Sequence, residues 1–213
     1  MLLLRFTLLS DGTSDRTLLP MLTWLFREHM PEGVALQEAH TDLGLHRQAP
    51  GRSDLGERIR LATELYPCDV LFVHRDAERA GDIAARFEEM DGGVRAAALD
   101  LPCIPIVPVR MSEAWLLIDE TTVREAAGRP RGRMKLTLPP LSRVEQVDAK
   151  QVLFDLLRTA SGTTGRRRRS FSVTQARQRV AELIEDFSPL RTLETFGILE
   201  QHVADFCSQL NGA

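Results

Sequence analysis

Short apolar runs alternate with segments of helical periodicity over the first half of the chain. Four runs of strand length are predicted strands: Met1–Ser10, Gly33–His40, Asp69–His74 and Ile104–Val109. The third run, DVLFVH, is continuously apolar after its first residue, which is typical of a parallel strand covered on both faces. Pro105 and Pro108 have no backbone N–H, so the fourth strand is expected at an edge of the sheet or with a distorted end.

Helices are predicted between these strands. Apolar residues recur at helical spacing within Ser14–His29, after Asp54, within Arg79–Met90 and within Ser112–Ile118. Asp54 can cap its helix, and Glu57 follows at the spacing of a capping box. The alternation predicts an α/β fold with a mainly parallel sheet and right-handed crossovers. Ligands of such sheets bind at the carboxyl ends of the strands.

The pattern changes after Asp119. Arg129–Leu141 is rich in Arg, Pro and Gly and is a predicted loop. Helical periodicity returns in Val147–Thr159, Val173–Phe187 and Leu190–Leu210. We therefore predict a core in residues 1–120 and a helical elaboration with a basic loop, packed on that core, in residues 121–213.

Composition narrows the class of protein. The 213 residues include three cysteines, Cys68, Cys103 and Cys207, without a CxxC pair, so the sequence suggests neither a disulfide framework nor a cysteine zinc site. The apolar opening MLLLRFTLL is short and contains Arg5, which favours a strand over a signal peptide. No apolar run approaches the roughly 20 residues of a membrane span. We expect a cytoplasmic protein without a membrane partner.

The net charge of −3 conceals a strong asymmetry. From Arg124 to Arg179 there are fourteen Lys and Arg but four Asp and Glu, which predicts an anion-binding surface on an acidic body. Within it, Lys150 and the run Arg166, Arg167, Arg168 and Arg169 are candidates for binding a nucleic-acid backbone. A solvated run, or a dock for an acidic partner protein, is the alternative interpretation.

Acidic residues follow three of the predicted strands. Asp11 comes after the first strand, Asp76 after the third and Glu113 after the fourth, so the three carboxylates are expected to converge. Clustered carboxylates suit Mg²⁺, which activates water and stabilises charge in phosphodiester cleavage. Each residue also has a simpler interpretation, since Asp11-Gly12 is a common turn and the other acids suit helix starts. His74 fits a packed strand-end histidine better than a catalytic one.

Three segments carry a resemblance to a known family. LLSDGTSDRTLLPML, with Asp11 and Gly12, resembles the first TOPRIM motif, in which Glu is usual at the acidic position. VLFVHRDAERAGD, with Asp76 and Glu78, resembles the second motif, in which Asp is more usual at the second acid. VPVRMSEAWLLID is similar to the Glu-Ala-Trp signature of a TOPRIM-like bacterial family of formerly unknown function. DAKQVL and FSPLRTLETFGIL resemble the tail of that family.

The resemblance implies a toxic effector nuclease of anti-phage defence that cuts RNA or DNA with Mg²⁺, or with Mn²⁺ in its place. Such effectors act in abortive infection beside an ABC-type or SMC-like ATPase, as in PARIS-type systems. The implied metal ligands and catalytic residues are Asp11, Asp76, Glu78 and Glu113, supported by Gly12, Asp15, Asp82 and Asp119. Arg75 and Arg110 leave strand ends and join the candidates for binding phosphate.

Other functions are weighed against this one. A degenerate TOPRIM module that only docks or regulates a partner is the main alternative, and phosphoryl or nucleotidyl transfer is a second. A topoisomerase is disfavoured because Tyr66, the single tyrosine, lies beside Pro67 and far from the predicted site. Walker A, GxGxxG and GxSxG motifs are absent, which disfavours P-loop ATPases, Rossmann oxidoreductases and serine hydrolases. A homodimer is left open.

Overall fold

The computed structural model describes residues 2–41, 43, 54–165 and 170–212. Its centre is a four-stranded parallel sheet in the order β2-β1-β3-β4, made of β1 (Leu2–Leu9), β2 (Val34–His40), β3 (Val70–His74) and β4 (Cys103–Ile106). The predicted α/β class and all four predicted strands are confirmed. The prediction that the proline-containing strand lies at an edge is confirmed as well.

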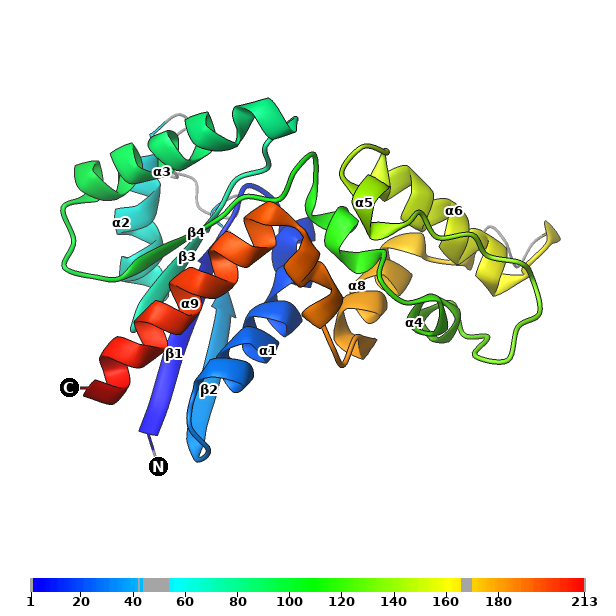
Figure 1. Cartoon of the computed structure of the whole chain (residues 1–213), viewed down its shortest axis with the longest axis horizontal. Helices are drawn as coiled ribbons and strands as arrows, with labels where there is room; N and C mark the ends of the chain where they lie inside the picture. The colour runs from blue at the N-terminus through cyan, green and yellow to red at the C-terminus, as the bar shows by residue number, and fades with distance from the viewer. Residues whose placement is uncertain (1, 42, 44–53, 166–169, 213) are drawn as a thin grey trace.

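The sheet separates two hydrophobic layers. On one face, α1 (Leu19–His29) and α9 (Glu194–Gly212) pack over Phe6 and Phe72, whose rings meet edge to face at 5.8 Å (Figure 1). On the other face, α2 (Leu55–Leu65) and α3 (Ile83–Ala97) cover Leu71 and Val73. Every residue of β3 is buried, because helices cover both of its faces.

Close backbone approach brings α2 and α3 together. A Cβ atom placed on Gly93 would lie 2.6 Å from the Cγ atom of Leu55, and one on Gly56 would lie 2.8 Å from the Cβ atom of Ala96. Gly93 therefore stands inside α3 for a packing reason, although glycine weakens a helix interior. This packing extends α3 beyond its predicted end at Met90 to Ala97, where Ala98 adopts a left-handed φ of 52°.

The remaining helices form a lobe beside the sheet. It contains α4 (Glu120–Ala126), α5 (Leu141–Val144), α6 (Ala149–Ser161) and α8 (Val173–Leu183) (Figure 1). Their buried side chains, including Val123, Leu157 and Val180, belong to the same hydrophobic cluster as the α1 face of the sheet. The chain then passes through η5 (Ser188–Thr192) and returns to the sheet as α9.

Short 3-10 helices, labelled η, replace parts of the predicted α-helices. The segment predicted to be helical from Ser14 begins as η1 (Thr13–Leu18), and the α-helix starts at Leu19. Pro20 explains the boundary, because proline lacks an N–H and fits the first turn of an α-helix. Two further short helices are η3 (Ala80–Asp82) and η4 (Ser112–Leu116). Among the described helices, none is long and apolar enough to cross a membrane.

Asp119 caps α4. Its carboxylate accepts hydrogen bonds from the backbone nitrogens of Thr121 at 3.0 Å and Thr122 at 2.8 Å. Burial alone would raise the pKa of Asp119, but the hydrogen bond from the Thr122 hydroxyl and those from the two backbone nitrogens outweigh it and hold the pKa below its ordinary value of 3.8. Because the folded-state pKa is lowered, the stabilisation is present above the unfolded-state pKa and is lost as pH falls through the folded-state value.

We therefore expect Asp119→Ala to lower the free energy of unfolding by about 1 kcal/mol at pH 7, as for other helix caps. Asp119→Asn keeps an acceptor for the same amides and should retain most of the stability. Urea denaturation at pH 7 and pH 3 measures both variants, and the deficit of Asp119→Ala should shrink at the lower pH. An equal deficit at both values would contradict a stabilising role for the ionised cap.

Candidate functional site

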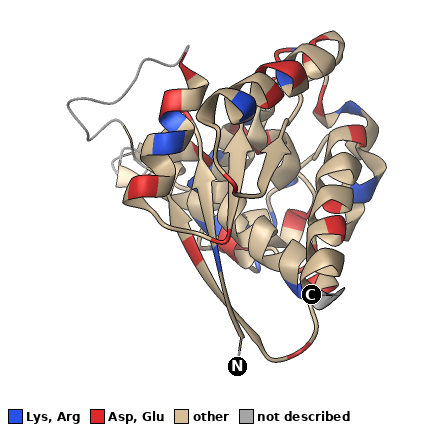
Figure 2. Ribbon diagram, turned by 90° about the vertical axis from the view of Figure 1, so that its left-hand side faces the viewer, with Lys and Arg blue, Asp and Glu red and all other residues tan. Residues whose placement is uncertain are grey.

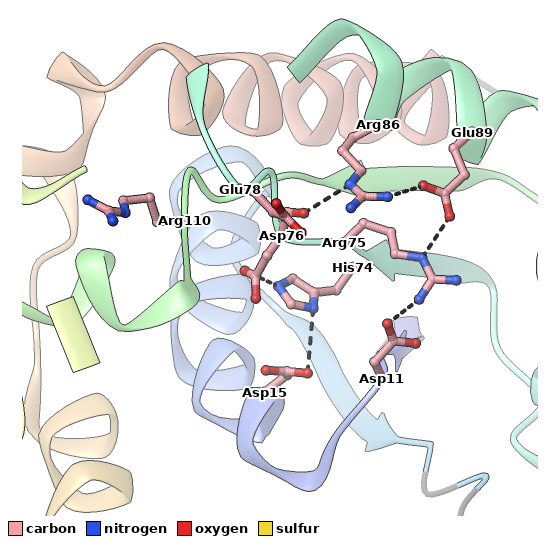
Figure 3. A pocket seen from close by; sticks show the side chains of 9 residues that line it. All are labelled: Asp11, Asp15, His74, Arg75, Asp76, Glu78, Arg86, Glu89 and Arg110. Atoms are coloured by element: carbon pink, nitrogen blue, oxygen red, sulfur yellow. Dashed lines mark hydrogen bonds and ion pairs between the residues drawn. The ribbon is translucent and has the colours of Figure 1, made fainter. Parts of the chain in front are cut away.

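A pocket of about 500 Å³ lies at the carboxyl ends of β1 and β3. The residues that line it come from the end of β3, from the segments that follow β1, β3 and β4, and from α3: Asp11, Asp15, His74, Arg75, Asp76, Glu78, Arg86, Glu89 and Arg110 (Figure 3). The predicted convergence of the acids that follow β1 and β3 is therefore met by Asp11 and Asp76.

The turn after β1 fixes the first acidic residues. Oγ of Ser10 donates to the carbonyl of Gly12 at 3.0 Å, and the backbone nitrogen of Asp15 donates to the same carbonyl at 3.2 Å. The backbone nitrogen of Gly12 in turn donates to Oδ2 of Asp15 at 3.3 Å. These contacts hold Asp15 inside the turn, and its buried carboxylate faces the pocket.

Two buried arginines hold the carboxylate of Asp11. Arg58 of α2 approaches Oδ1 at 3.1 Å and also donates to the carbonyl of Ser10 at 2.9 Å. Arg75, directly after β3, pairs with Oδ2. The side chains of Arg58 and Arg75 are 8% and 7% exposed. In this arrangement Asp11 is a carboxylate shared by two buried guanidinium groups, whose burial requires such compensation.

The ion pairs continue from Arg75 to α3. Nε of Arg75 lies 3.2 Å from Oε1 of Glu89, whose second oxygen lies 2.6 Å from Arg86. Arg86 also donates to the backbone carbonyl of Asp76 at 3.0 Å. The hydrogen bond from Arg86 to Glu89 raises the pKa of this guanidinium, so Arg86 stays charged. One wall of the pocket is thus a continuous set of alternating charges (Figure 3).

His74 lies between two carboxylates. Its Nδ1 is 3.5 Å from Oδ2 of Asp15, and its Nε2 is 3.2 Å from Oδ1 of Asp76. Burial lowers the pKa of His74, but the contact with Asp76 and the charges of Asp15 and Asp76 outweigh burial and raise this pKa overall. The carboxylates therefore favour the imidazolium form, and the histidine holds Asp15 and Asp76 on either side of its ring.

The fit of a divalent cation differs between the carboxylates. Asp76 and Glu78 supply the oxygen ligands that Mg²⁺ prefers, and the one side-chain contact described for Oδ1 of Asp76 is Nε2 of His74 at 3.2 Å. Asp11 is held by its two arginines. Across the described ranges, no group of three His, Cys, Asp or Glu side chains is close enough together to hold a metal ion. The chemistry of Asp76 and Glu78 fits Mg²⁺, whereas Asp11 fits it only after an arginine withdraws.

Glu113 lies outside the pocket, contrary to the predicted convergence. It is buried in η4 and accepts a hydrogen bond from Arg177 of α8 at 2.7 Å. The neighbouring Trp115 packs edge to face on Phe196 of α9, with ring centroids 5.5 Å apart. The Glu-Ala-Trp segment therefore joins the helical lobe to the sheet. A metal ligand at Glu113 would require this buried ion pair to break.

The other candidate residues are dispersed. Asp82 pairs with Arg79 at 3.2 Å near the start of α3, and Asp119 caps α4. Lys150 is exposed on α6. Arg110 lines the pocket with a left-handed φ of 66° and donates to the carbonyl of Gln146 at 2.6 Å. The run 166–169 lies outside the described residues.

Sequence reasoning missed one residue that supports the pocket, Arg58, and two that line it, Arg86 and Glu89. Arg58 interrupts the apolar stripe of α2 and is buried beside Leu55 and Ile59, so an arginine on an apolar face was the available signal for a buried carboxylate partner. Arg86 and Glu89 are three residues apart and form an ordinary helical ion pair. Their sequence gives no sign that Glu89 also contacts Arg75.

Comparisons of the chain with protein-family models, with curated proteins and with solved structures find no match. The TOPRIM-like resemblance consequently rests on the motifs of the sequence and stays a prediction.

Glu113 and Arg177 allow the structural and catalytic interpretations to be separated. Removing one member of a buried ion pair leaves an uncompensated charge, which costs about 3–5 kcal/mol, whereas replacing both by apolar residues is often neutral. We expect Glu113→Leu to lower the free energy of unfolding by several kcal/mol and Glu113→Leu/Arg177→Met to regain most of it. Urea denaturation of Glu113→Leu, Arg177→Met and the double variant measures these free energies. Full stability of Glu113→Leu would contradict the structural assignment.

Proposed function

We propose that the protein hydrolyses phosphodiester bonds of nucleic acid with a divalent cation bound in the strand-end pocket. The observation that carries the proposal is the gathering of carboxylates and arginines in one pocket at the ends of β1 and β3. Carboxylates suit a cation, and guanidinium groups suit the phosphate oxygens of a substrate. Asp11, Asp76 and Glu78 line this pocket and are also the acidic residues of the TOPRIM-like motifs. The resemblance therefore supports the same reaction.

Asp76 and Glu78 are the residues that would hold Mg²⁺ or Mn²⁺. The bound ion would supply charge stabilisation on the phosphate and an activated water. His74 and Asp15 position Asp76 from behind. Arg110, fixed at the pocket wall by its contact with Gln146, would bind a phosphate of the substrate. A left-handed backbone at a residue other than glycine is strained, and such strain is common at functional sites.

Arg75 connects the anion-binding and cation-binding roles of the pocket. In the described structure its charge is satisfied by Asp11 and Glu89. A phosphate that draws the guanidinium toward itself weakens the pair with Asp11, and the released carboxylate then faces the pocket. Substrate binding would in this way add Asp11 to the acidic residues available to the cation.

The biological role is proposed from the resemblance. It is that of a toxic effector in anti-phage defence, restrained by an ABC-type or SMC-like ATPase until infection. RNA and DNA are both candidate substrates. A homodimer is compatible with this role.

One observation favours the alternative, a catalytically degenerate module that docks a partner. Asp11 is neutralised by two buried arginines, and three potential ligands do not converge within the described residues. In a docking module the same ion pairs would serve to stabilise the ends of the strands.

The decisive experiment compares Asp76→Asn with Asp82→Asn, a matched carboxylate that does not line the pocket. Wild type and both variants are incubated with tRNA and plasmid DNA in Mg²⁺, Mn²⁺ or EDTA. We expect metal-dependent cleavage that falls about 100-fold or more in Asp76→Asn and is unchanged in Asp82→Asn. Cleavage that survives EDTA would refute the metal role. If wild type cleaves neither substrate, even with its ATPase partner added, the docking alternative holds.

Replacing Arg75 should move two affinities in opposite directions. Arg75→Gln removes a charge that competes with a cation for Asp11, so Mn²⁺ should bind about 10-fold more tightly, as expected for loss of a like charge at ion-pair distance. The same variant loses a phosphate-binding group, so an oligonucleotide in EDTA should bind more weakly. Calorimetry measures the affinity for Mn²⁺, and fluorescence anisotropy measures the affinity for the oligonucleotide.

Arg79→Gln provides the control, since Arg79 is exposed and pairs with Asp82. Arg75→Lys keeps the charge at the same position and guards against a folding defect in Arg75→Gln. If folded Arg75→Gln binds both Mn²⁺ and the oligonucleotide more weakly than wild type does, the proposal that Arg75 competes with the cation for Asp11 is contradicted.

A further inference from the structure

The loop after α4 concentrates positive charge. We call residues Arg129–Lys135 the arginine loop; its sequence is RPRGRMK, and the whole stretch 126–144 contains no Asp or Glu. Arg129, Arg131, Arg133 and Lys135 are all exposed. In the part of the chain that the structure describes, no ion pair joins any of these four cations to a carboxylate. Their mutual repulsion is therefore not relieved by an acidic neighbour.

Internal hydrogen bonds nevertheless fix the backbone of the arginine loop. Arg124 reaches out of α4 and donates to the carbonyls of Gly132 at 2.8 Å and Met134 at 2.7 Å. The backbone nitrogen of Gly132 donates to the carbonyl of Arg129 at 2.9 Å, which closes a turn. Gly128, with φ of 76°, supplies the left-handed backbone with which the chain leaves α4. The cations are thus presented on an ordered scaffold.

The arginine loop surrounds a hollow of about 620 Å³ lined by residues 129–134. Pro130 and Met134 contribute its apolar surface, and the side chain of Met134 is largely exposed. On the side of the molecule formed by α2, α3 and the end of α9, basic and acidic positions are interspersed (Figure 2). The arginine loop differs from that side because its charges have one sign.

We propose that the arginine loop docks the sugar–phosphate backbone of the nucleic-acid substrate. The inference rests on the proposed function and adds a binding surface away from the pocket. Several exposed cations spread over one ordered loop suit a polyanion, whereas a single small anion is held by buried, convergent donors. Pro130 and Met134 would contact the sugars between phosphates. The arginines of the pocket are paired with its carboxylates at short range, so a separate basic surface is needed to attract a polyanion from a distance.

The test measures binding without cleavage. Fluorescence anisotropy with labelled tRNA and a DNA oligonucleotide is recorded in EDTA from 50 to 300 mM KCl for wild type and Arg131→Gln/Arg133→Gln. Each lost phosphate contact reduces the magnitude of the negative slope of log K against log salt by about 0.7–0.9, so the double variant should reduce that magnitude by about 1.5. The control Arg27→Gln/Arg95→Gln removes two exposed arginines on other surfaces and should leave the slope unchanged.

The outcomes separate this inference from the proposed function. If wild type binds and cleaves but the slope of Arg131→Gln/Arg133→Gln equals that of wild type, the docking surface is refuted and the nuclease proposal stands. If wild type neither binds nor cleaves either nucleic acid, both are refuted. Poly-glutamate that competes as strongly as nucleic acid per unit charge would assign the arginine loop to an acidic partner protein and overturn the inference.

Discussion

The arrangement of the pocket depends on the pairing of Asp11 with Arg58 and Arg75. A buried guanidinium without a carboxylate would cost several kcal/mol, and Asp11 is the carboxylate that the two buried arginines share. The three residues come from the loop after β1, from α2 and from the end of β3. Their contacts fix the spacing of the two strand ends, and Glu89 extends the constraint to α3.

The parts of the site that depend on local sequence or on the sheet topology could be predicted from the sequence. Apolar runs and their periodicity predicted the strands, and the strand-end rule then placed Asp11 and Asp76 together. Local sequence also identified Asp54 as a cap, and its side chain accepts from the backbone nitrogen of Glu57 at 3.0 Å. These features depend on residues close in sequence or on the topology of a parallel sheet. They therefore leave a signal in the pattern.

Glu113 shows where this reasoning stops. The rule assumes that the segment after β4 continues toward the strand ends, as the segment after β3 does. Instead the chain passes through the left-handed Arg110 and enters η4, where Glu113 points into the interface with α8. Its partner, Arg177, is 64 residues away in the sequence. Nothing local to Glu113 distinguishes a strand-end ligand from half of a buried ion pair, since both are acids at the start of a helix.

Positive charge in the molecule falls into two groups: cations that balance the carboxylates of the pocket, and cations available to attract a polyanion from a distance. A site that gathers carboxylates can be kept folded without a bound cation only if internal positive charges balance it, and Arg58, Arg75, Arg86 and His74 have that position here. Arginines engaged in this way cannot also attract a distant polyanion, because their field is cancelled at short range. Long-range attraction then requires cations that lack internal partners. Among the described residues the cations of the arginine loop form no ion pair with a carboxylate, and the loop does not line the pocket, so its charges are not cancelled by the carboxylates there.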